Sequence, residues 1–459
     1  FSSKYKSKLK NLDNNELLRS ILKYEKLEEK IYFLKSFSFL THCTNQLDKH
    51  VSKFYQSTNE TLSNIEKNLI FFSLEFNKLS KTKINYVKST KYKSLVENLN
   101  KFKKFQQSEV VEKLLMEKSL TSSSAWIKFF DQTMTRLKFS FRNKKLSETE
   151  ILNLFSSPEQ SIRRDAALSF AKTLKEQIFN FTFIMNNISK DLDIDTKLRG
   201  FKFSESSRHL SNQIDKEDVD SLVKTVKGNY RNICHRYYNY KAKCFGQKKL
   251  NFWDRNAPYP GRKTDNISWS KAKSIVLESY NDFDKRLGSI ANIFFEKNWI
   301  HAKPMNGKTS GAFSHPTVPS CHPYILMNYQ GKTRDVMTLA HELGHGVHQY
   351  LASKQGLLLA DTPLTLAETA SVFGEMLTFK SLLRKTRNKD ERIYLLRSKI
   401  EDMINTVFRQ ISFFIFEREI HSLRSKFELS DDDISEVWMK TQKESLGNSV
   451  NLTNDYKSF

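Results

Sequence analysis

The segment "TLAHELGHGVHQY", residues 338–350, brings histidines and a glutamate together at the spacing of a metal site. His341 and His345 are four residues apart, so on a helix both imidazoles leave the same face and can bind one tetrahedral ion. Glu342 points about a quarter-turn away and can reach a water molecule on that ion rather than the ion itself. The pattern therefore predicts a zinc site with Glu342 as the general base.

A tetrahedral catalytic zinc needs a third protein ligand. His348 lies on the same face as His341 but about 10 Å along the helix axis from it, too far for both to bind one ion. The segment "DTPLTLAETASVFGEM", residues 361–376, offers better donors, because Glu368 and Glu375 are seven residues apart and share a face of a second helix. We expect Glu368 to complete a His-His-Glu site and Glu375 to orient one of its ligands.

Two helices must position these side chains. The first is expected to have Thr333 as its cap and Asp335 in its first turn, and to end near Gly356. Its apolar stripe consists of Val336, Ala340, Leu343, Val347 and Leu351. The second is expected to have Thr362 as its cap and Pro363 as its first residue, and a loop around Gly356 would let it fold back on the first. The alternative interpretation is that His341 and His345 are hydrogen-bonded core residues and Glu368 is a solvated helix residue.

The rest of the chain is predicted to be mainly α-helical. The first 199 residues contain no glycine and one proline, Pro158, which with Ser157 as cap is typical of a fresh helix start. Six of the eight prolines lie between residues 258 and 323, and Tyr324 to Tyr329 just after them is expected to form a strand. In residues 15–34 apolar side chains recur at three- and four-residue steps, as in an amphipathic helix: Leu17, Leu18, Ile21, Leu22, Leu27, Ile31 and Leu34.

The composition limits the classes of function. With 459 residues, 39% of them hydrophobic, the chain can bury a large core, and its apolar runs are far shorter than the roughly 20 residues that cross a bilayer. The four cysteines form no CxxC pair, so a cytoplasmic location is expected. The net charge of +24 suits a nucleic-acid binder, but the basic residues are spread along the chain, and we expect a solvated surface without a specific nucleic-acid partner.

The chain resembles oligoendopeptidase F, a relative of thimet oligopeptidase among the zinc metallopeptidases. The resemblance rests on "TLAHELGHGVHQYLAS", "DTPLTLAETASVFGEM", "GKTSGAF", "HPYILMNY", "RHLSNQ" and "FWDRNAPYP". It implies a mostly α-helical, bowl- or clamshell-shaped peptidase with a small β-sheet beside the histidine helix. One Zn²⁺ would lie at the bottom of a deep channel that short unstructured peptides enter. By motif position its ligands are His341, His345 and Glu368, with Glu342 as general base and Glu375 behind the ligands.

The resemblance also divides the chain into an N-terminal helical domain, residues 1–165, and a catalytic domain, residues 166–459. In the family a later helical segment, rich in tyrosine and carrying a histidine, donates hydrogen bonds to the oxyanion that forms during attack. The sequence holds no such segment up to "NDYKSF". We therefore expect these donors beyond Phe459 and a catalytic domain that lacks its C-terminal helical segment. The alternative is a catalytically impaired homologue that binds peptides.

Two segments are candidates for contacts with a peptide substrate. An extended peptide can add alongside the predicted strand by backbone hydrogen bonds, and the glycine-flanked "GKTSGAF", residues 307–313, can close over it as a mobile loop. The alternatives are a core strand and a plain turn. The residues predicted to bind substrate are Gly311, Ala312, Tyr324, Ile325 and Leu326.

Overall fold

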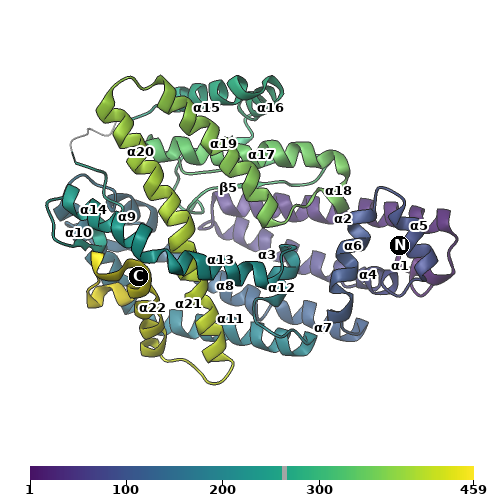
Figure 1. Ribbon diagram of the computed structural model, residues 1–459. Helices are drawn as coiled ribbons and strands as arrows, with labels where there is room; N and C mark the ends of the chain where they lie inside the picture. Colours follow the sequence, from purple (N-terminus) through teal and green to yellow (C-terminus); the bar gives the residue numbers. More distant parts are fainter. Residues whose placement is uncertain (261–265, 459) are drawn as a thin grey trace. The chain divides into compact units, whose positions relative to one another are not determined.

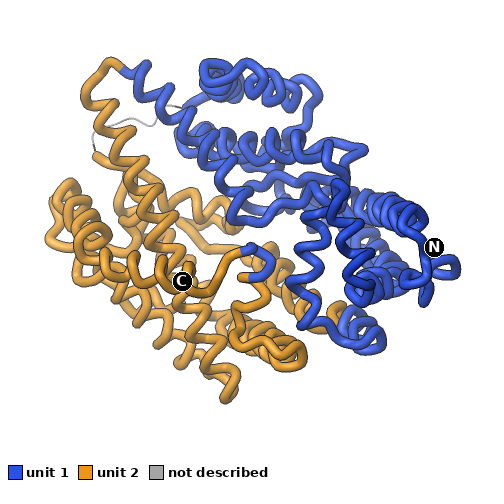
Figure 2. Tube along the Cα trace, turned by 45° about the vertical axis from the view of Figure 1, so that its right-hand side comes forward, with its two compact units in different colours: residues 1–118, 210–213, 264–386 blue, residues 119–209, 214–263, 387–459 orange. Residues whose placement is uncertain are grey.

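The computed structural model describes residues 1–260 and 266–458, most of which are helical (Figure 1). The chain forms two compact units, each built from separated stretches of sequence (Figure 2). The first unit comprises residues 1–118, 210–213 and 264–386, and the second comprises residues 119–209, 214–263 and 387–459. The mainly α-helical fold that the sequence predicts is confirmed.

The first unit consists mainly of helices, and a small sheet lies within its stretch of residues 264–386. Its elements are α1 (Ser2–Tyr5), η1 (Leu9–Asn11), α2 (Asn14–Thr44), α3 (Lys49–Glu66), α4 (Ile70–Phe76), α5 (Lys81–Lys88), α6 (Lys93–Phe102), η2 (Lys103–Phe105), α7 (Glu109–Ser119), α15 (Trp269–Phe283), α16 (Lys285–Glu296), β4 (Ile300–His301), β5 (Phe313–His315), β6 (Tyr324–Leu326), α17 (Thr333–Ala352), η5 (Ser353–Gln355), α18 (Leu357–Ala360) and α19 (Leu364–Lys385).

The second unit is also helical, with two short two-stranded pairings, β1 with β2 and β3 with β7. Its elements are α8 (Ser123–Arg136), β1 (Phe139–Phe141), β2 (Lys144–Leu146), α9 (Glu148–Leu154), α10 (Gln160–Glu176), α11 (Ile178–Arg199), α13 (Lys216–Gly228), η3 (Tyr230–His235), α14 (Arg236–Cys244), β3 (Leu250–Asn251), η4 (Phe252–Asp254), α20 (Lys389–Ile404), η6 (Asn405–Arg409), α21 (Gln410–Arg424), α22 (Asp431–Leu446), η7 (Gly447–Ser449), β7 (Val450–Asn451) and η8 (Asn454–Ser458). Helix α12 (Ser206–Ser211) has residues in both units, and the last residue of α7, Ser119, belongs to the second unit.

Each unit has its own apolar core. In the first unit, aromatic side chains of α4 pack with leucines and isoleucines of α2, and this cluster contains Leu17, Ile21, Phe71, Phe72 and Phe76. In the second unit, the buried cluster draws on α10, α14 and α22 and contains Phe139, Phe170, Tyr238, Trp438 and Tyr456. Burial of this apolar surface stabilises each unit, and in the second unit it anchors helix α14.

Helix α2 is the long N-terminal helix that the sequence predicts. Leu17, Ile21 and Ile31 from its apolar stripe are buried, whereas Leu22 and Leu34 are 43% and 48% exposed. At about 100° per residue, Leu22 and Leu34 point more than about 90° away from Leu17. The buried stripe is therefore narrower than the sequence pattern suggests.

Helix α10 begins at Gln160, two residues later than predicted from Ser157 and Pro158. Arg163 Nη1 donates hydrogen bonds to the carbonyl oxygens of Ser157, at 2.7 Å, and Pro158, at 2.9 Å. Asp254 holds this guanidinium in a buried ion pair at 2.7 Å. Because these carbonyl groups are bound from the side, the segment before α10 stays outside the helix.

The sheet of the first unit has the strand order β4-β6-β5. Strand β6 is shorter than the predicted Tyr324 to Tyr329, and it pairs parallel with β4 and antiparallel with β5. It is therefore the central strand. The expectation that a peptide adds alongside β6 is wrong, because both edges of this strand are already hydrogen-bonded.

No helix within residues 1–260 and 266–458 combines the length and the apolar character needed to cross a bilayer. Both compact units take residues from either side of position 165. The division into residues 1–165 and 166–459 therefore stays a prediction about the modules of the sequence.

Candidate metal centre

Helix α17 carries the two histidines, and local contacts explain its ends. Asp335 Oδ2 accepts a hydrogen bond from the backbone N–H of Lys332 at 3.0 Å, so the predicted acidic residue of the first turn stabilises the start. Lys332 is the N-cap, and the predicted cap Thr333 is the first helical residue. After the helix the chain turns at Gly356, whose φ of +89° favours glycine.

Both predicted helices are present, with small shifts at their ends. Helix α19 begins at Leu364 with Pro363 as N-cap, one residue later than predicted, because Pro363 supplies the first helical carbonyl acceptor. Most of the predicted stripe of α17 is buried, namely Val336, Ala340, Leu343 and Val347. Leu351 at its end is half-buried.

Helices α17 and α19 approach closely because small residues face each other where they pack. A Cβ atom added at Gly344 would lie 2.6 Å from the carbonyl oxygen of Ala370, and one added at Gly374 would lie 3.0 Å from the carbonyl oxygen of Ala340. The buried hydroxyl of Tyr280, from α15, donates to that carbonyl of Ala340 at 2.6 Å. The helix backbones are thus close enough for side chains from both to reach one point.

The side chains of His341, His345 and Glu368 meet at that point. One ligand atom from each lies within 4.8 Å of the others. Glu368 Oε2 is 3.4 Å from Nε2 of His341, and Glu368 Oε1 is 3.6 Å from Nε2 of His345. The structure therefore brings together the three residues that the sequence singles out as metal ligands, and His348 is not part of this group.

Glu375 lies behind the first histidine. Its Oε2 atom is 3.5 Å from Nδ1 of His341, the ring nitrogen that faces away from Glu368. A carboxylate at Nδ1 fixes the tautomer and the orientation of the ring, so that Nε2 presents its lone pair to an ion. This is the position in which an orienting residue would act.

Glu342 is buried, with 6% of its surface exposed, and its Oε2 atom has no hydrogen-bond partner within the part of the chain that the structure describes. Burial raises the pKa of this carboxyl group, while the neighbouring imidazoles of His341 and His345 oppose the shift. An unpartnered buried carboxyl oxygen is costly unless a further group completes its hydrogen bonding. Its place beside the two histidines suits a bound water molecule.

The protonation of the ligands follows from their mutual contacts. Burial disfavours a charge on His341, but hydrogen bonds to Glu368 and Glu375 outweigh it and raise the pKa of the imidazole to about 9. Hydrogen bonds from His341 and His345 hold the pKa of Glu368 well below its usual range. His341 thus retains its proton at neutral pH, because the carboxylates of Glu368 and Glu375 stabilise a positive charge at this site.

This donor set fits a zinc ion. Two imidazole nitrogens and one carboxylate oxygen are the three-ligand set of many catalytic zinc sites, which leave a fourth position for water. The ion would take the place of the proton that His341 otherwise retains. Glu342, whose free oxygen atom is buried beside the histidines, is placed to accept a hydrogen bond from that water.

Strand β5 forms the edge of the sheet that lies next to Glu342. The backbone amide of Ser314 faces Glu342 and lowers the pKa of its carboxyl group, and the backbone carbonyl of Ser314 accepts a hydrogen bond from Gln349 at 3.1 Å. In an extended chain Ala312, two residues earlier, presents its backbone groups in the same direction. Within the described residues, neither the backbone N–H nor the backbone carbonyl of Ala312 forms a hydrogen bond. An open stretch of sheet edge therefore lies close to the candidate metal centre.

The residues predicted to bind substrate on β6 are differently placed. Ile325 and Leu326 are 1% and 3% exposed and belong to the core, so their side chains cannot contact a peptide. Tyr324 is 39% exposed. The core interpretation of this strand, left open by the sequence, is the correct one.

The segment "GKTSGAF" is tied down along much of its length. Lys308 Nζ donates to the backbone carbonyls of His301, Lys303 and Met327 at 3.0, 2.9 and 2.6 Å. Backbone hydrogen bonds join the neighbouring residues to the end of α2. These contacts hold the segment as a fixed approach to β5, and they do not favour the interpretation of a closing loop.

Sequence reasoning missed two groups that position the centre. Tyr280 donates to the carbonyl of Ala340, which immediately precedes His341, and the backbone amide of Ser314 faces Glu342 and lowers its pKa. Neither residue lies in a metal-binding motif, and nothing in the sequence around Tyr280 or Ser314 indicates that either residue lies close to residue 341 in the fold.

Comparison with known proteins agrees with this geometry. The profile of Peptidase family M3 matches residues 153–459, more than half of the chain, and a profile described as Oligopeptidase F matches residues 75–139. The chain is 26% identical over 466 residues to Oligopeptidase PepF of Bacillus subtilis, covering 98% of this chain and 68% of that protein. It is 28% identical over 450 residues to the Oligoendopeptidase F homolog of Borreliella burgdorferi, covering 95% of this chain and 75% of that protein.

Solved structures share the fold. PZ peptidase A with an inhibitor has a TM-score of 0.84 at 15% identity, covering 98% of this chain and 79% of that one. Oligoendopeptidase-F from Enterococcus faecium has a TM-score of 0.73 at 19% identity, covering 100% of this chain and 79% of that one. With a matching family profile over most of its length and the His-His-Glu cluster in place, the chain belongs to peptidase family M3, among the relatives of oligoendopeptidase F.

Proposed function

We propose that this protein is a zinc-dependent endopeptidase that hydrolyses short, unstructured peptides. One observation carries the proposal: His341 and His345 of α17 and Glu368 of α19 aim their ligand atoms at one point, beside a buried glutamate with an oxygen atom that has no partner among the described residues. These three residues would hold the ion, and Glu375 would orient His341. The names of the relatives, oligopeptidase and oligoendopeptidase, support oligopeptides as the class of substrate.

When bound, zinc would polarise the peptide carbonyl and lower the pKa of a water molecule toward neutrality. Glu342 accepts a proton from the attacking water and returns it to the amine nitrogen of the leaving peptide. Its burial raises its pKa, which suits a group that must both take and return a proton near neutral pH.

We place the peptide along the open edge near β5, with Gly311 and Ala312 as the contact residues. The backbone groups of Ala312 face the same side as those of Ser314, which contact Glu342 and Gln349 of α17. A peptide that pairs with this edge would have a carbonyl group delivered close to Glu342. Backbone pairing is independent of side chains, which suits an enzyme that accepts many short sequences.

We also infer a reducing compartment such as the cytoplasm for this reaction. All four cysteines, Cys43, Cys234, Cys244 and Cys321, are free thiols. Proteins that act in oxidising compartments more often use such residues in disulfide bonds.

The decisive experiment compares the purified protein with the variant Glu342→Gln. We expect zinc content near one ion per chain in both, and cleavage of an internally quenched peptide of about ten residues reduced by about 10²–10⁴-fold in the variant. Glu368→Gln should lose both zinc and cleavage, and Glu428→Gln, at an exposed site, should lose neither. A wild-type protein that binds zinc but cleaves no better than Glu342→Gln would be a peptide-binding homologue, and the proposal would be wrong.

A further inference from the structure

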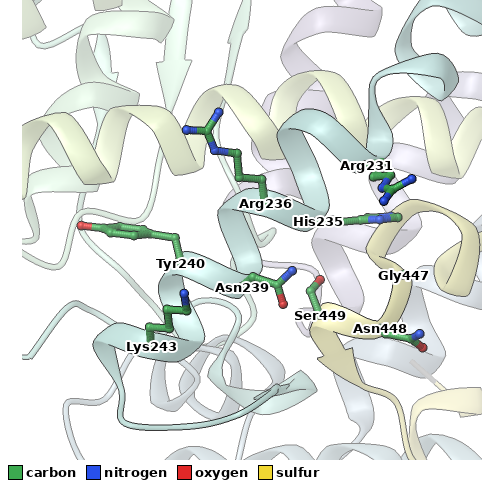
Figure 3. Close-up of a pocket in the computed structure, with 9 residues that line it drawn as sticks. All are labelled: Arg231, His235, Arg236, Asn239, Tyr240, Lys243, Gly447, Asn448 and Ser449. Carbon is green, nitrogen blue, oxygen red and sulfur yellow. The ribbon is translucent and has the colours of Figure 1, made fainter.

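A pocket of about 720 Å³ lies entirely within the second unit and shares no residue with the candidate metal centre (Figure 3). Consecutive helical turns of η3 and α14 line it with Arg231, His235, Arg236, Asn239, Tyr240 and Lys243, and the turn η7 completes it. Volumes of about 300–1,000 Å³ are typical of sites for small molecules. The size therefore permits a ligand up to that of a nucleotide.

The spacing of the polar residues on α14 explains why they share the pocket. Arg236, Asn239, Tyr240 and Lys243 occupy positions i, i+3, i+4 and i+7, which lie on one face of a helix. The opposite face is buried and contains Tyr237, Tyr238, Lys241 and Ala242. The preceding element η3 is a π-helical turn, a feature that is frequent at functional sites.

The buried face of α14 is fixed by an ion pair. Lys241 is fully buried, and its Nζ atom lies 2.7 and 2.8 Å from the two carboxylate oxygens of Glu401. The hydroxyl of Tyr237 donates to Glu401 at 2.8 Å. Because these groups hold α14 from behind, the side chains on its outer face extend from a rigid support, as a preorganised binding site requires.

The pocket carries positive charge without counter-charge. None of the nine described lining residues is Asp or Glu. Arg231, Arg236 and Lys243 form no ion pair or side-chain hydrogen bond with any residue in 1–260 and 266–458. Other cations of this unit do pair, for example Lys227 with Glu444 at 2.8 Å. The three charges are therefore available to an external anion.

The far wall of the pocket is shaped around His235. Its Nε2 atom lies 3.1 Å from the carbonyl oxygen of Glu444, to which it donates when that nitrogen carries the proton. A Cβ atom added at Gly447 would lie 2.6 to 2.9 Å from the His235 ring, so only glycine allows this close approach. The ring is thereby held in place, with Nδ1 left as a second polar group.

We propose that this pocket binds a small anion that carries phosphate groups, up to the size of a nucleoside triphosphate. Guanidinium groups donate two parallel hydrogen bonds to phosphate oxygens, and Arg231 and Arg236 supply two such groups to one cavity. Lys243 adds a point charge. The ring of Tyr240, whose hydroxyl accepts from Arg397 Nε at 2.8 Å, offers a fixed aromatic surface at the same pocket.

Calorimetric titration of the full chain with inorganic tripolyphosphate at low ionic strength tests the proposal. The double variant Arg236→Gln/Lys243→Gln should bind about tenfold more weakly or worse, because it loses two charge-assisted contacts. The matched control Lys172→Gln/Lys175→Gln removes the same charge from exposed positions of α10 and should bind as the wild type does. Arg236→Lys keeps the charge but loses the planar guanidinium group, so its affinity for tripolyphosphate should lie between those of the wild type and the double variant Arg236→Gln/Lys243→Gln.

Further titrations distinguish the sources of phosphate. If tripolyphosphate and ATP bind with equal affinity and adenosine does not bind, the pocket recognises the phosphate chain alone. If ATP binds more tightly than tripolyphosphate, the pocket also contacts the nucleoside. Both outcomes support the proposal. It is overturned if the wild type binds neither, if the control variant weakens as much as the pocket variant, or if tetraglutamate binds more tightly than tripolyphosphate. None of these measurements depends on peptide cleavage.

Discussion

Gly344 of α17 lies so close to Ala370 of α19 that a Cβ atom at position 344 would be 2.6 Å from the Ala370 carbonyl oxygen. This approach sets the distance between the helix that carries the histidines and the helix that carries Glu368. The metal centre thus depends on a residue that has no side chain.

The variant Gly344→Ala should weaken zinc binding and destabilise the fold. Alanine favours a helix over glycine, but here the added methyl group meets backbone atoms and forces the helices apart, at a cost of about 1–3 kcal/mol. Zinc affinity and the urea unfolding midpoint check this. The control is Gly228→Ala in α13, where an added Cβ meets nothing within 4 Å and should be neutral or stabilising. Unchanged zinc affinity in Gly344→Ala would contradict the role of this contact.

Glu375→Gln should lower zinc affinity by about 10–100-fold while the three ligands remain. The amide is uncharged and holds Nδ1 of His341 less firmly than the carboxylate does at 3.5 Å. Competition with a chromogenic chelator measures the change. Glu278→Gln removes a carboxylate of α15 that pairs with Lys385 at the far end of α19, and should leave the affinity unaltered. Equal affinities for both variants would show that Glu375 does not orient the ligand.

His315 in β5 should make the first unit sensitive to mild acid. Burial lowers the pKa of this imidazole to about 4, and Ser36 Oγ lies 2.9 Å from its Nε2 atom. Because a free histidine has a pKa near 6.5, the unfolded chain takes up the proton first as pH falls. The stabilisation is complete above about pH 6.5 and is lost as pH falls toward 4, with a difference of about 2 kcal/mol between pH 7 and pH 5.

The measurement is the change in unfolding free energy between pH 7 and pH 5 for the wild type and for His315→Gln. The variant should lose less stability than the wild type over this interval, by about 2 kcal/mol. His50→Gln, at an exposed histidine, should behave as the wild type does. A pH dependence that is identical in wild type and His315→Gln would mean that this imidazole stays accessible to protons.

Ala312→Pro should impair peptide cleavage without loss of zinc. Proline removes the backbone N–H that would pair with a substrate at the open edge near β5. We expect a lower kcat/KM for peptide substrates, by about tenfold for one lost hydrogen bond, with the same zinc stoichiometry. Ala312→Ser keeps the N–H and serves as the control. If the two variants cleave equally well, the peptide does not pair at this residue.

The metal ligands could be predicted because their spacing expresses helix geometry. His341 and His345 share a face whatever surrounds the helix, and Glu368 and Glu375 share a face for the same reason. The ends of the helices were less predictable, since Lys332, Pro363 and the carbonyls held by Arg163 shift them by one or two residues. Such contacts come from side chains that no local pattern indicates.

The order of strands in the sheet shows most clearly what local sequence patterns cannot predict. The apolar run at Tyr324 predicts a strand, but only tertiary structure places it between β4 and β5, whose paired residues lie 9 to 25 positions earlier. Because β6 is paired on both sides, the backbone groups that remain open to a peptide are those of Ala312 and not those of residues 324–326. The anion pocket has the same origin, because α14 and the turn η7 are about 200 residues apart in sequence.

The sequence by itself determined which side chains could bind an ion, because a helix repeats every 3.6 residues and spacing alone fixes its faces. Tertiary structure decided whether those faces would meet. The close approach of two helices at glycine and alanine, the buried hydroxyl of Tyr280 and the pairing of short strands all join distant parts of the chain, and each depends on shape complementarity that no single segment encodes.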